Sequence, residues 1–316
     1  IINYMNKSDY LKDVLETHKM SKIQTLVNKY NDKRSKIESS IKEHYGSNMY
    51  SSFMSGSFAK HTATNIKFDM DVVIPFKRDS FDTLQNMFDD IYTFLANTYT
   101  DAQEIRKQKV SVGITFKKDD DGDQVQIDVV PGRELTKDDY KDSNDLHLYF
   151  NDDHWGFKKG TWTKTNIQAQ IDNIKGKKSE REVIRLLKIW KKRLNKDYKS
   201  FMLELFVIKS FTNYEGSNDL WERLKHAMQY IADHITDDNF KLIDPGNSNN
   251  DVLSSMDSFK KQLLASDMLS IISNVESNDE NIKVYFKKNE KFQSNDRQKG
   301  FGENVISYPP TGKRFG

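Results

Sequence analysis

The stretch GSFAKHTATNIKFDMD, residues 56–71, decides the fold of this chain. It ends in two aspartates one residue apart, Asp69 and Asp71, and the apolar run 72–76 follows them directly. The β-branched residues of that run predict a buried strand that continues from the aspartates. Because side chains two residues apart on a strand share a face, we expect both carboxylates to project together. Neighbouring carboxylates repel each other unless a cation lies between them, and Mg²⁺ prefers such oxygen ligands.

A third carboxylate, Asp128, lies in a second strand-like segment. Residues 124–130, QVQIDVV, alternate polar and apolar positions and end at a Pro-Gly pair. The run 109–116 is also strand-like, and the acidic turn 119–123 joins the two as a hairpin. If this hairpin lies beside the first strand, Asp128 faces the first pair across the sheet. Two metal ions roughly 3.5–4 Å apart could then hold an attacking oxygen and a leaving pyrophosphate. The alternative is structural, since turns and strand ends often carry aspartate.

These motifs resemble those of a known superfamily. A Gly-Ser pair, here Gly56 and Ser57, a DxD motif on the next strand and a third aspartate on a later strand are typical of DNA polymerase beta-like nucleotidyltransferases. The fuller forms GSFAKHTAT, DMDVVIPF and IDVVPGRE resemble the bacterial cGAS/DncV-like branch, the CD-NTases. The resemblance implies an α+β fold with a catalytic sheet lobe, a helical C-terminal lobe and a long N-terminal helix that braces both.

The chain is expected to divide into three parts. Residues 1–160 would form the catalytic lobe, including a continuous amphipathic helix over 8–45. Residues 161–288 would form the helical lobe, and 289–316 a flexible tail with prolines and glycines near its end. Phosphates and metals would lie in the cleft between the lobes, a usual place for ligands.

Composition is consistent with a cytoplasmic enzyme. The 316 residues are 30% charged, carry a net charge of +2 and include no cysteine. The sequence lacks both an apolar run of about 18 residues and a signal-peptide pattern, so no membrane association is expected. The missing cysteines exclude disulfides, thiolate zinc sites and a cysteine nucleophile. No zinc-ligand cluster like that of the animal DNA sensor is present, so we expect no obligatory DNA partner.

Two features suit phosphate binding. At Gly56 a phosphate can approach the backbone closely, and the Ser57 hydroxyl can join the exposed N–H groups of the turn. Most Gly-Ser pairs are ordinary turns, and this one is more informative because it lies 13 residues before Asp69.

Positive charge is concentrated in residues 156–199, which hold fourteen Lys or Arg against four Asp or Glu. This excess could neutralise a polyphosphate, although a solvated basic face is the alternative.

The resemblance implies roles for three residues in that region. Lys188, in RLLKIW on a helix predicted over 179–195, matches the family lysine that contacts the donor triphosphate. Ser200 and Phe201, at the head of the next helix, match a serine that binds the triphosphate and an aromatic residue that stacks on the donor base. Both roles are physically reasonable, because helix N-termini bind anions and aromatic faces stack on any base. The alternatives are a plain N-cap for the serine, a core position for the aromatic residue, and Tyr198 as the stacking residue.

Two other polar groups are assigned no chemistry. His61 lies between the motif pieces, but carboxylates already supply a base, so we interpret it as a polar loop residue. The acidic run 119–123 has its glycine in the wrong register for a calcium loop and lacks the glutamate at the twelfth position. A solvated turn is therefore expected there.

The resemblance implies a synthase of cyclic oligonucleotide second messengers in anti-phage (CBASS) defence, with a cyclic dinucleotide as the favoured product. Asp69 and Asp71 would hold two Mg²⁺ ions, for which Mn²⁺ can substitute. Asp128 would hold the ion nearer the acceptor hydroxyl and help its deprotonation. The implied substrates are ATP, GTP or both, with UTP as a further candidate, and the product would act on an effector protein.

The last residue, Gly316, resembles the C-terminal residue that a ubiquitin-transfer-like enzyme conjugates in several members of the family. A frayed terminus is the alternative. Three other functions use similar features: an RNA or tRNA nucleotidyltransferase, an aminoglycoside-modifying nucleotidyltransferase, and a non-enzymatic nucleotide sensor. An RNA enzyme would need a basic, aromatic-lined track, which is not evident, and the complete set of carboxylates argues against a sensor.

Overall fold

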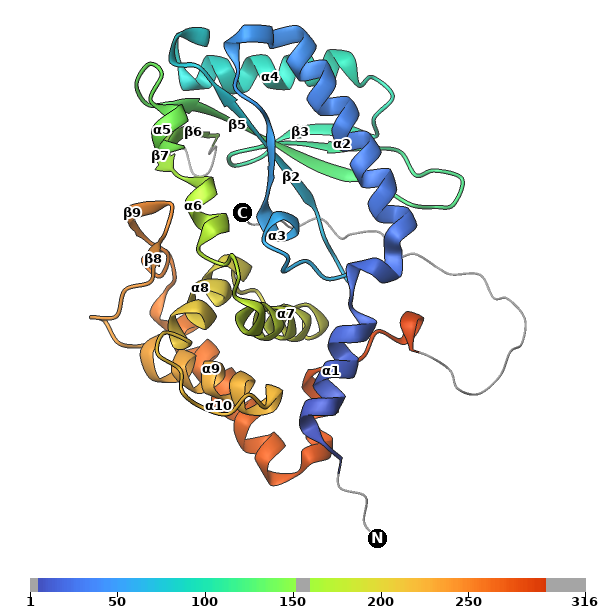
Figure 1. Cartoon of the computed structure of the whole chain (residues 1–316), viewed down its shortest axis with the longest axis vertical. Coiled ribbons are helices and arrows are strands. Elements are labelled where there is room, and N and C mark those ends of the chain that lie inside the picture. The colour runs from blue at the N-terminus through green and yellow to red at the C-terminus, as the bar shows by residue number, and fades with distance from the viewer. Residues whose placement is uncertain (1–4, 152–159, 294–316) are drawn as a thin grey trace. The chain divides into compact units, whose positions relative to one another are not determined.

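The computed structural model describes residues 5–151 and 160–293, and the chain divides into two compact units. We call them the sheet unit and the helical unit (Figure 1). Among the described residues, the sheet unit comprises 23–60, 68–151 and 160–172, and the helical unit comprises 5–22, 61–67 and 173–293.

The sheet unit contains one sheet of seven strands in its described part. Its strand order is β1-β2-β5-β4-β3, and β6 pairs with both β5 and β7. The β2–β5 pair is parallel and the others are antiparallel. The expected hairpin, β4 with β5, therefore lies beside the DMD strand, β2. The elements are α2 (Gln24–Tyr45), β1 (Phe53–Ser55), α3 (Gly56–Ala59), β2 (Met70–Phe76), α4 (Leu84–Thr98), β3 (Glu104–Lys107), β4 (Val112–Thr115), β5 (Gln126–Glu134), α5 (Tyr140–Ser143), β6 (Leu146–Phe150), β7 (Thr161–Thr165) and α6 (Ile167–Asp172).

The alternation along β2 and β5 divides the two faces of this sheet. Val72 and Val129 lie in the core that the sheet forms with α2 and α4. Val73 and Val130, the next residue on each strand, lie in a separate small cluster on the opposite face. Period-two alternation then assigns the odd positions of β2 and the even positions of β5 to that second face.

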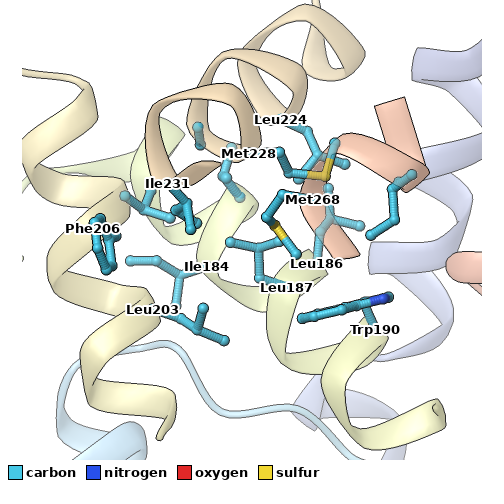
Figure 2. Packing of buried hydrophobic residues seen from close by; sticks show 14 of the residues in the cluster. Ile184, Leu186, Leu187, Trp190, Leu203, Phe206, Leu224, Met228, Ile231 and Met268 are labelled. Carbon is cyan, nitrogen blue, oxygen red and sulfur yellow. The ribbon is translucent and has the colours of Figure 1, made fainter. Parts of the chain in front are cut away.

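The helical unit is built around α7 and α8. The apolar residues of α7 form a buried stripe, and α8 is buried on nearly all sides. Figure 2 shows residues of one buried cluster, to which α7 contributes Ile184 and Leu187, α8 contributes Leu203, and the next helices contribute Met228 and Met268. The elements are α1 (Lys7–Thr17), α7 (Lys178–Arg193), α8 (Ser200–Ser210), α9 (Leu220–His234), β8 (Ile243–Asp244), β9 (Asn247–Asp251), α10 (Ser258–Ser277) and α11 (Ile282–Tyr285).

The N-terminal helix differs from the expectation in one respect. A long helix is present as α2, with 22 residues, but its predicted continuity with α1 is wrong, because α1 ends at Thr17. Asn65 Nδ2 donates to the backbone oxygens of Thr17 and Lys19 at 3.0 and 3.1 Å, and the Asn65 N–H donates to His18 O at 3.1 Å. These bonds satisfy carbonyls that a continuing helix would have used.

The unit boundaries also differ from the expected lobes. Residues 5–22 and 61–67 group with the helical unit rather than with the sheet, and 161–172 group with the sheet. Most of the expected tail, 294–316, lies outside the described residues, and so does Gly316. Among the described helices, none combines the length and the apolar character needed to span a membrane.

Candidate active site

Asp71 and Asp128 are direct neighbours across β2 and β5. The parallel register pairs them, and neighbouring strands lie about 4.8 Å apart. Both side chains belong to the face opposite the α2–α4 core, because Val72 and Val129, which follow them, point into that core. Asp71 is partly exposed, whereas Asp128 is only 7% exposed. The third carboxylate therefore lies beside the second and does not point into the apolar core.

Asp69 lies just outside this ladder. Strand β2 begins at Met70, so Asp69 is the last residue of the preceding connection, and it is partly exposed. The β2–β5 pairing fixes the backbone positions of Asp71 and Asp128, whereas Asp69 lies one residue before the first paired residue of β2. In the described part of the chain, three carboxylates with oxygens within 4.8 Å of one another occur at the acidic turn, and the predicted triad is not grouped that closely.

The acidic turn already has a cation among its carboxylates. Lys29 Nζ, from α2, lies 2.6, 2.7 and 2.8 Å from carboxylate oxygens of Asp119, Asp121 and Asp123. The hydrogen bond from Lys29 lowers the pKa of Asp119 below its usual range. A lysine ammonium occupies the place that a metal ion would take, so we interpret this group as a salt-bridged turn that attaches the β4–β5 hairpin to α2.

The Gly-Ser motif is brought directly against Asp71. Strand β1 passes into the single turn α3 at Gly56, whose φ is +64°. A Cβ built on Gly56 would lie 1.9 Å from Asp71 Oδ2 and 2.9 Å from its Cγ. Only glycine fits here, both because of the left-handed conformation and because the carboxylate occupies the space. Ser57 follows in the same turn and is partly exposed.

Asp128 has neighbours that the sequence analysis missed. Gln108 Nε2 donates a hydrogen bond of 3.0 Å to Asp128 Oδ1. Ser111 Oγ donates in turn to Gln108 Oε1 at 3.1 Å. On β4, Gly113 pairs with Asp128 in the sheet register. A glycine inside a strand signals a close approach of other groups, and this was the available signal, but nothing in the sequence marks Gln108.

In the helical unit, Lys188 bonds the segment that connects the Gly-Ser motif to the DxD motif. Its Nζ donates to Thr62 Oγ1 at 2.8 Å and to Thr62 O at 3.2 Å, and Thr62 is fully buried. Arg185 Nη1 donates to the carbonyl oxygen of His61 at 3.3 Å. His61 itself is exposed, as expected for a loop residue. The segment 61–67 is thus bound by basic residues of α7.

Ser200 is the first residue of α8, but it is not the N-cap. That position belongs to Lys199, whose side chain makes no capping bond. The Ser200 hydroxyl instead accepts a hydrogen bond of 3.1 Å from Lys191 Nζ. Burial lowers the pKa of Lys191. A basic side chain and a hydroxyl therefore meet at a helix N-terminus, an arrangement that suits an anion.

The two candidate stacking residues differ in exposure. Phe201 is partly buried and packs against the helical core. Tyr198 is only 5% exposed, lies parallel to Trp190 with ring centroids 5.9 Å apart, and donates to Asp267 Oδ2 at 2.8 Å. These contacts make Tyr198 a core residue.

Sequence similarity to curated proteins covers part of the chain. No protein-family model matches the sequence. The CBASS oligonucleotide cyclase CdnC of Escherichia coli strain KTE188 is 26% identical over 192 residues, which cover 56% of this chain and 56% of that protein. The chain thus spans about half the length of the curated relatives that it matches.

Solved structures match over a larger part of the chain. Escherichia coli MS115-1 CdnC with ATP has a TM-score of 0.66 at 18% identity, covering 90% of this chain and 98% of that one. The Bradyrhizobium diazoefficiens CD-NTase CdnG in complex with GTP has a TM-score of 0.67 at 12% identity, covering 89% and 95%. The expected polymerase beta-like α+β fold is confirmed. The chain is therefore similar to CdnC over part of its sequence, and it shares the fold of CdnC and of the CD-NTase CdnG.

Proposed function

We propose that this protein condenses NTPs into a cyclic oligonucleotide, a cyclic dinucleotide in the simplest case, and releases pyrophosphate. The observation that carries the proposal is the register pair Asp71 and Asp128, two adjacent carboxylates on the sheet face that is turned away from the main core. The product would be a signal in anti-phage defence, by analogy with the relative named a CBASS oligonucleotide cyclase.

The donor set suits magnesium. Asp69, Asp71 and Asp128 offer hard carboxylate oxygens, the ligands that Mg²⁺ prefers, and would hold two ions, with Mn²⁺ as a substitute. Bound there, the ions would neutralise the triphosphate and activate the attacking hydroxyl.

The side chains would position the reactants. The acceptor hydroxyl attacks the donor α-phosphorus, the bond from that phosphorus to pyrophosphate breaks, and Asp128 helps to remove the hydroxyl proton. The same step on the linear intermediate closes the ring. Gly56 and Ser57 would bind phosphate oxygens through the backbone and hydroxyl of α3. Positioning and charge neutralisation account for most catalysis in reactions of this kind.

Groups of the helical unit would bind the donor nucleotide. Lys188 and Ser200 would contact the triphosphate, and Phe201 would stack on the base, with about 1–3 kcal/mol per stacked base. Lys191 supports this role, because its bond to Ser200 adds a positive charge at the N-terminus of α8.

The substrates and partners follow from the relatives and from the sequence. ATP and GTP are the first candidates, because CdnC was solved with ATP and CdnG with GTP. UTP is a further candidate. An effector protein would read the product in the cytoplasm. Conjugation through Gly316 by a ubiquitin-transfer-like enzyme rests on the sequence alone, and a mass adduct at that residue would test it.

The direct experiment is incubation of the purified protein with all four NTPs and Mg²⁺ or Mn²⁺, with products identified by mass. We expect phosphatase-resistant cyclic products and stoichiometric pyrophosphate. If RNA or an aminoglycoside is added, transfer of a nucleotide to either one would identify one of the alternative enzymes. No pyrophosphate release in any mixture would favour the nucleotide sensor.

A further inference from the structure

We propose that Gln108 is a positioning residue for Asp128, and that Ser111 and Gly113 hold Gln108 in the required orientation. The inference rests on the proposed role of Asp128 as a metal-binding carboxylate. It adds a supporting group that neither the sequence motifs nor the resemblance indicates.

The β3–β4 hairpin turn brings Gln108 and Ser111 together. Gln108 follows the last residue of β3, and Ser111 precedes the first residue of β4. The turn is closed by the Gln108 N–H, which donates to Ser111 O at 2.8 Å. A four-residue turn therefore fixes the backbone of both residues, and their side chains also meet, with 3.1 Å between Ser111 Oγ and Gln108 Oε1.

Ser111 sets the orientation of the Gln108 amide. The Ser111 hydroxyl donates to Gln108 Oε1, which leaves the NH₂ group directed at Asp128 Oδ1, 3.0 Å away. With the amide reversed, Gln108 would present an oxygen to a carboxylate oxygen, and the Ser111 hydroxyl would face an NH₂ group. Ser111 is buried, so water competes little for this bond. Ser111 therefore selects the amide orientation that stabilises the Asp128 carboxylate.

Gly113 leaves space for the Gln108 amide beside Asp128. A Cβ built there would lie 2.2 Å from Gln108 Nε2 and 3.2 Å from Asp128 Oδ1. Any larger residue would have to displace the Gln108 amide from the carboxylate. The missing side chain at Gly113 therefore provides the space that the Gln108 amide occupies.

The chemical consequence is control of one carboxylate oxygen. An ionised carboxylate accepts about four hydrogen bonds or ligands, so a bond to Oδ1 fixes the side chain without using its full capacity. Groups that orient metal ligands in this way change metal affinity or activity by about 10–100-fold when they are removed. Gln108 would thereby hold Asp128 in its orientation before the metal arrives.

The test is Gln108→Leu, which keeps the approximate size and removes the amide. Its matched control is Gln103→Leu. Gln103 is an exposed glutamine of the same unit, and it accepts from Gln124 Nε2 at 2.6 Å rather than bonding a site carboxylate. Three quantities are measured: the Mn²⁺ affinity of the protein by electron paramagnetic resonance, kcat and KM for NTP, and Tm. Asp128→Asn is the reference for Mn²⁺ binding that depends on this carboxylate.

We expect Gln108→Leu to weaken Asp128-dependent Mn²⁺ binding and to lower kcat by about 10-fold each. The KM for NTP and the Tm should stay close to those of the wild type, and Gln103→Leu should change none of the three. Wild-type Mn²⁺ affinity in Gln108→Leu would overturn the inference. Equal losses in both leucine variants would also overturn it, because the effect would then be general.

Gly113→Ala provides a second, independent test. In the wild-type background the new methyl group displaces Gln108, so the loss should be similar to that of Gln108→Leu. In a Gln108→Ala background the amide is absent and the nearest group to a Cβ is Asp128 Oδ1 at 3.2 Å, so Gly113→Ala should add a smaller loss than it causes in the wild-type background. Equal losses in both backgrounds would contradict a route through Gln108.

The inference and the proposed function can fail separately. A wild-type protein that binds Mn²⁺ through Asp128 but forms no cyclic product would refute the function, while the Mn²⁺ affinities would still decide the role of Gln108. Product formation that is insensitive to Gln108→Leu would refute only the positioning role. A wild-type protein without Asp128-dependent Mn²⁺ binding would overturn both.

Discussion

Gly56 and Asp71 are in direct contact, and the contact leaves no room for a side chain on the glycine: a Cβ there would lie 1.9 Å from Asp71 Oδ2. Two motifs that are separated in the sequence are therefore parts of one local structure. On β1 and β5, Ser55 and Asp128 are the register partners of Asp71 on its two sides. The glycine of the Gly-Ser motif then has a second role besides allowing phosphate to approach, because it leaves space for the Asp71 carboxylate.

Gly56→Ala should displace Asp71 and reduce product formation by at least about 100-fold, in line with losses measured for displaced catalytic groups. Gly46→Ala is a matched control, since Gly46 also has a positive φ, +52°, but a Cβ built there would have no atom within 4 Å. Both substitutions should cost stability, because alanine is strained at a positive φ. Only Gly56→Ala should lower kcat. Equal activity in the two variants would show that the contact has no catalytic importance.

Lys188→Met should raise the KM for NTP about 10-fold, corresponding to roughly 1.4 kcal/mol of lost binding. Thr62→Val removes the hydroxyl that Lys188 bonds at 2.8 Å but keeps the lysine and the side-chain volume. If Lys188 binds the triphosphate, Thr62→Val should leave KM within about two-fold of wild type and cost about 1 kcal/mol of stability. A KM that rises equally in Thr62→Val would instead mean that Lys188 acts by anchoring the segment 61–67.

Stability should fall as the pH decreases from 7.5 to 5.5. Burial lowers the pKa of His18 and of His147. The Nδ1 of His18 lies 2.7 Å from Val14 O, and its Nε2 is buried without an acceptor, so the charged ring has no partner for its second proton. The unfolded chain then takes up protons at a higher pH than the folded one, starting near pH 6.5, at a cost of up to about 1.4 kcal/mol per pH unit for each histidine.

The measurement for this prediction is the urea midpoint at the two pH values. His18→Gln and His147→Gln should each reduce the difference between the midpoints. Equal midpoints at pH 7.5 and 5.5 in the wild type would contradict the assignment of either histidine.

Lys29→Met should destabilise the acidic turn and leave kcat unchanged. Three carboxylates, those of Asp119, Asp121 and Asp123, would then face one another without the ammonium that now bonds them. Added salt should recover part of the lost stability, since repulsion between exposed charges is screened. Urea midpoints at low and high salt test this expectation. A folded Lys29→Met protein that no longer forms product would instead make this turn part of the active site.

The sequence predicted the sheet well because its signals are local. The apolar run after Asp71 and the alternation around Asp128 predicted two strands, and the structure pairs these strands directly. The Gly-Ser motif was recognised as a turn, but its contact with Asp71 depends on the register of β1 against β2. The pattern of residues along the sequence does not show how β1 is aligned against β2.

The missed features are tertiary. The break after α1 depends on Asn65, a residue 48 positions after Thr17 in the sequence, whose amide satisfies the terminal carbonyls. The support of Asp128 depends on a glutamine in a turn of ordinary composition. Such contacts form only when distant segments pack together. The position of an asparagine or glutamine in the sequence does not indicate which group its amide will bond.

The most direct test of the central claim is the rate of pyrophosphate release from NTPs in Asp71→Asn and Asp128→Asn proteins with Mg²⁺. Asp120→Asn is the control, because Asp120 is an exposed aspartate of the β4–β5 hairpin turn outside the Lys29 group. The account predicts that both site variants stay folded and lose release by at least about 1,000-fold, since charge stabilisation at the reacting phosphate dominates such catalysis. Release near the wild-type rate in either site variant would contradict it.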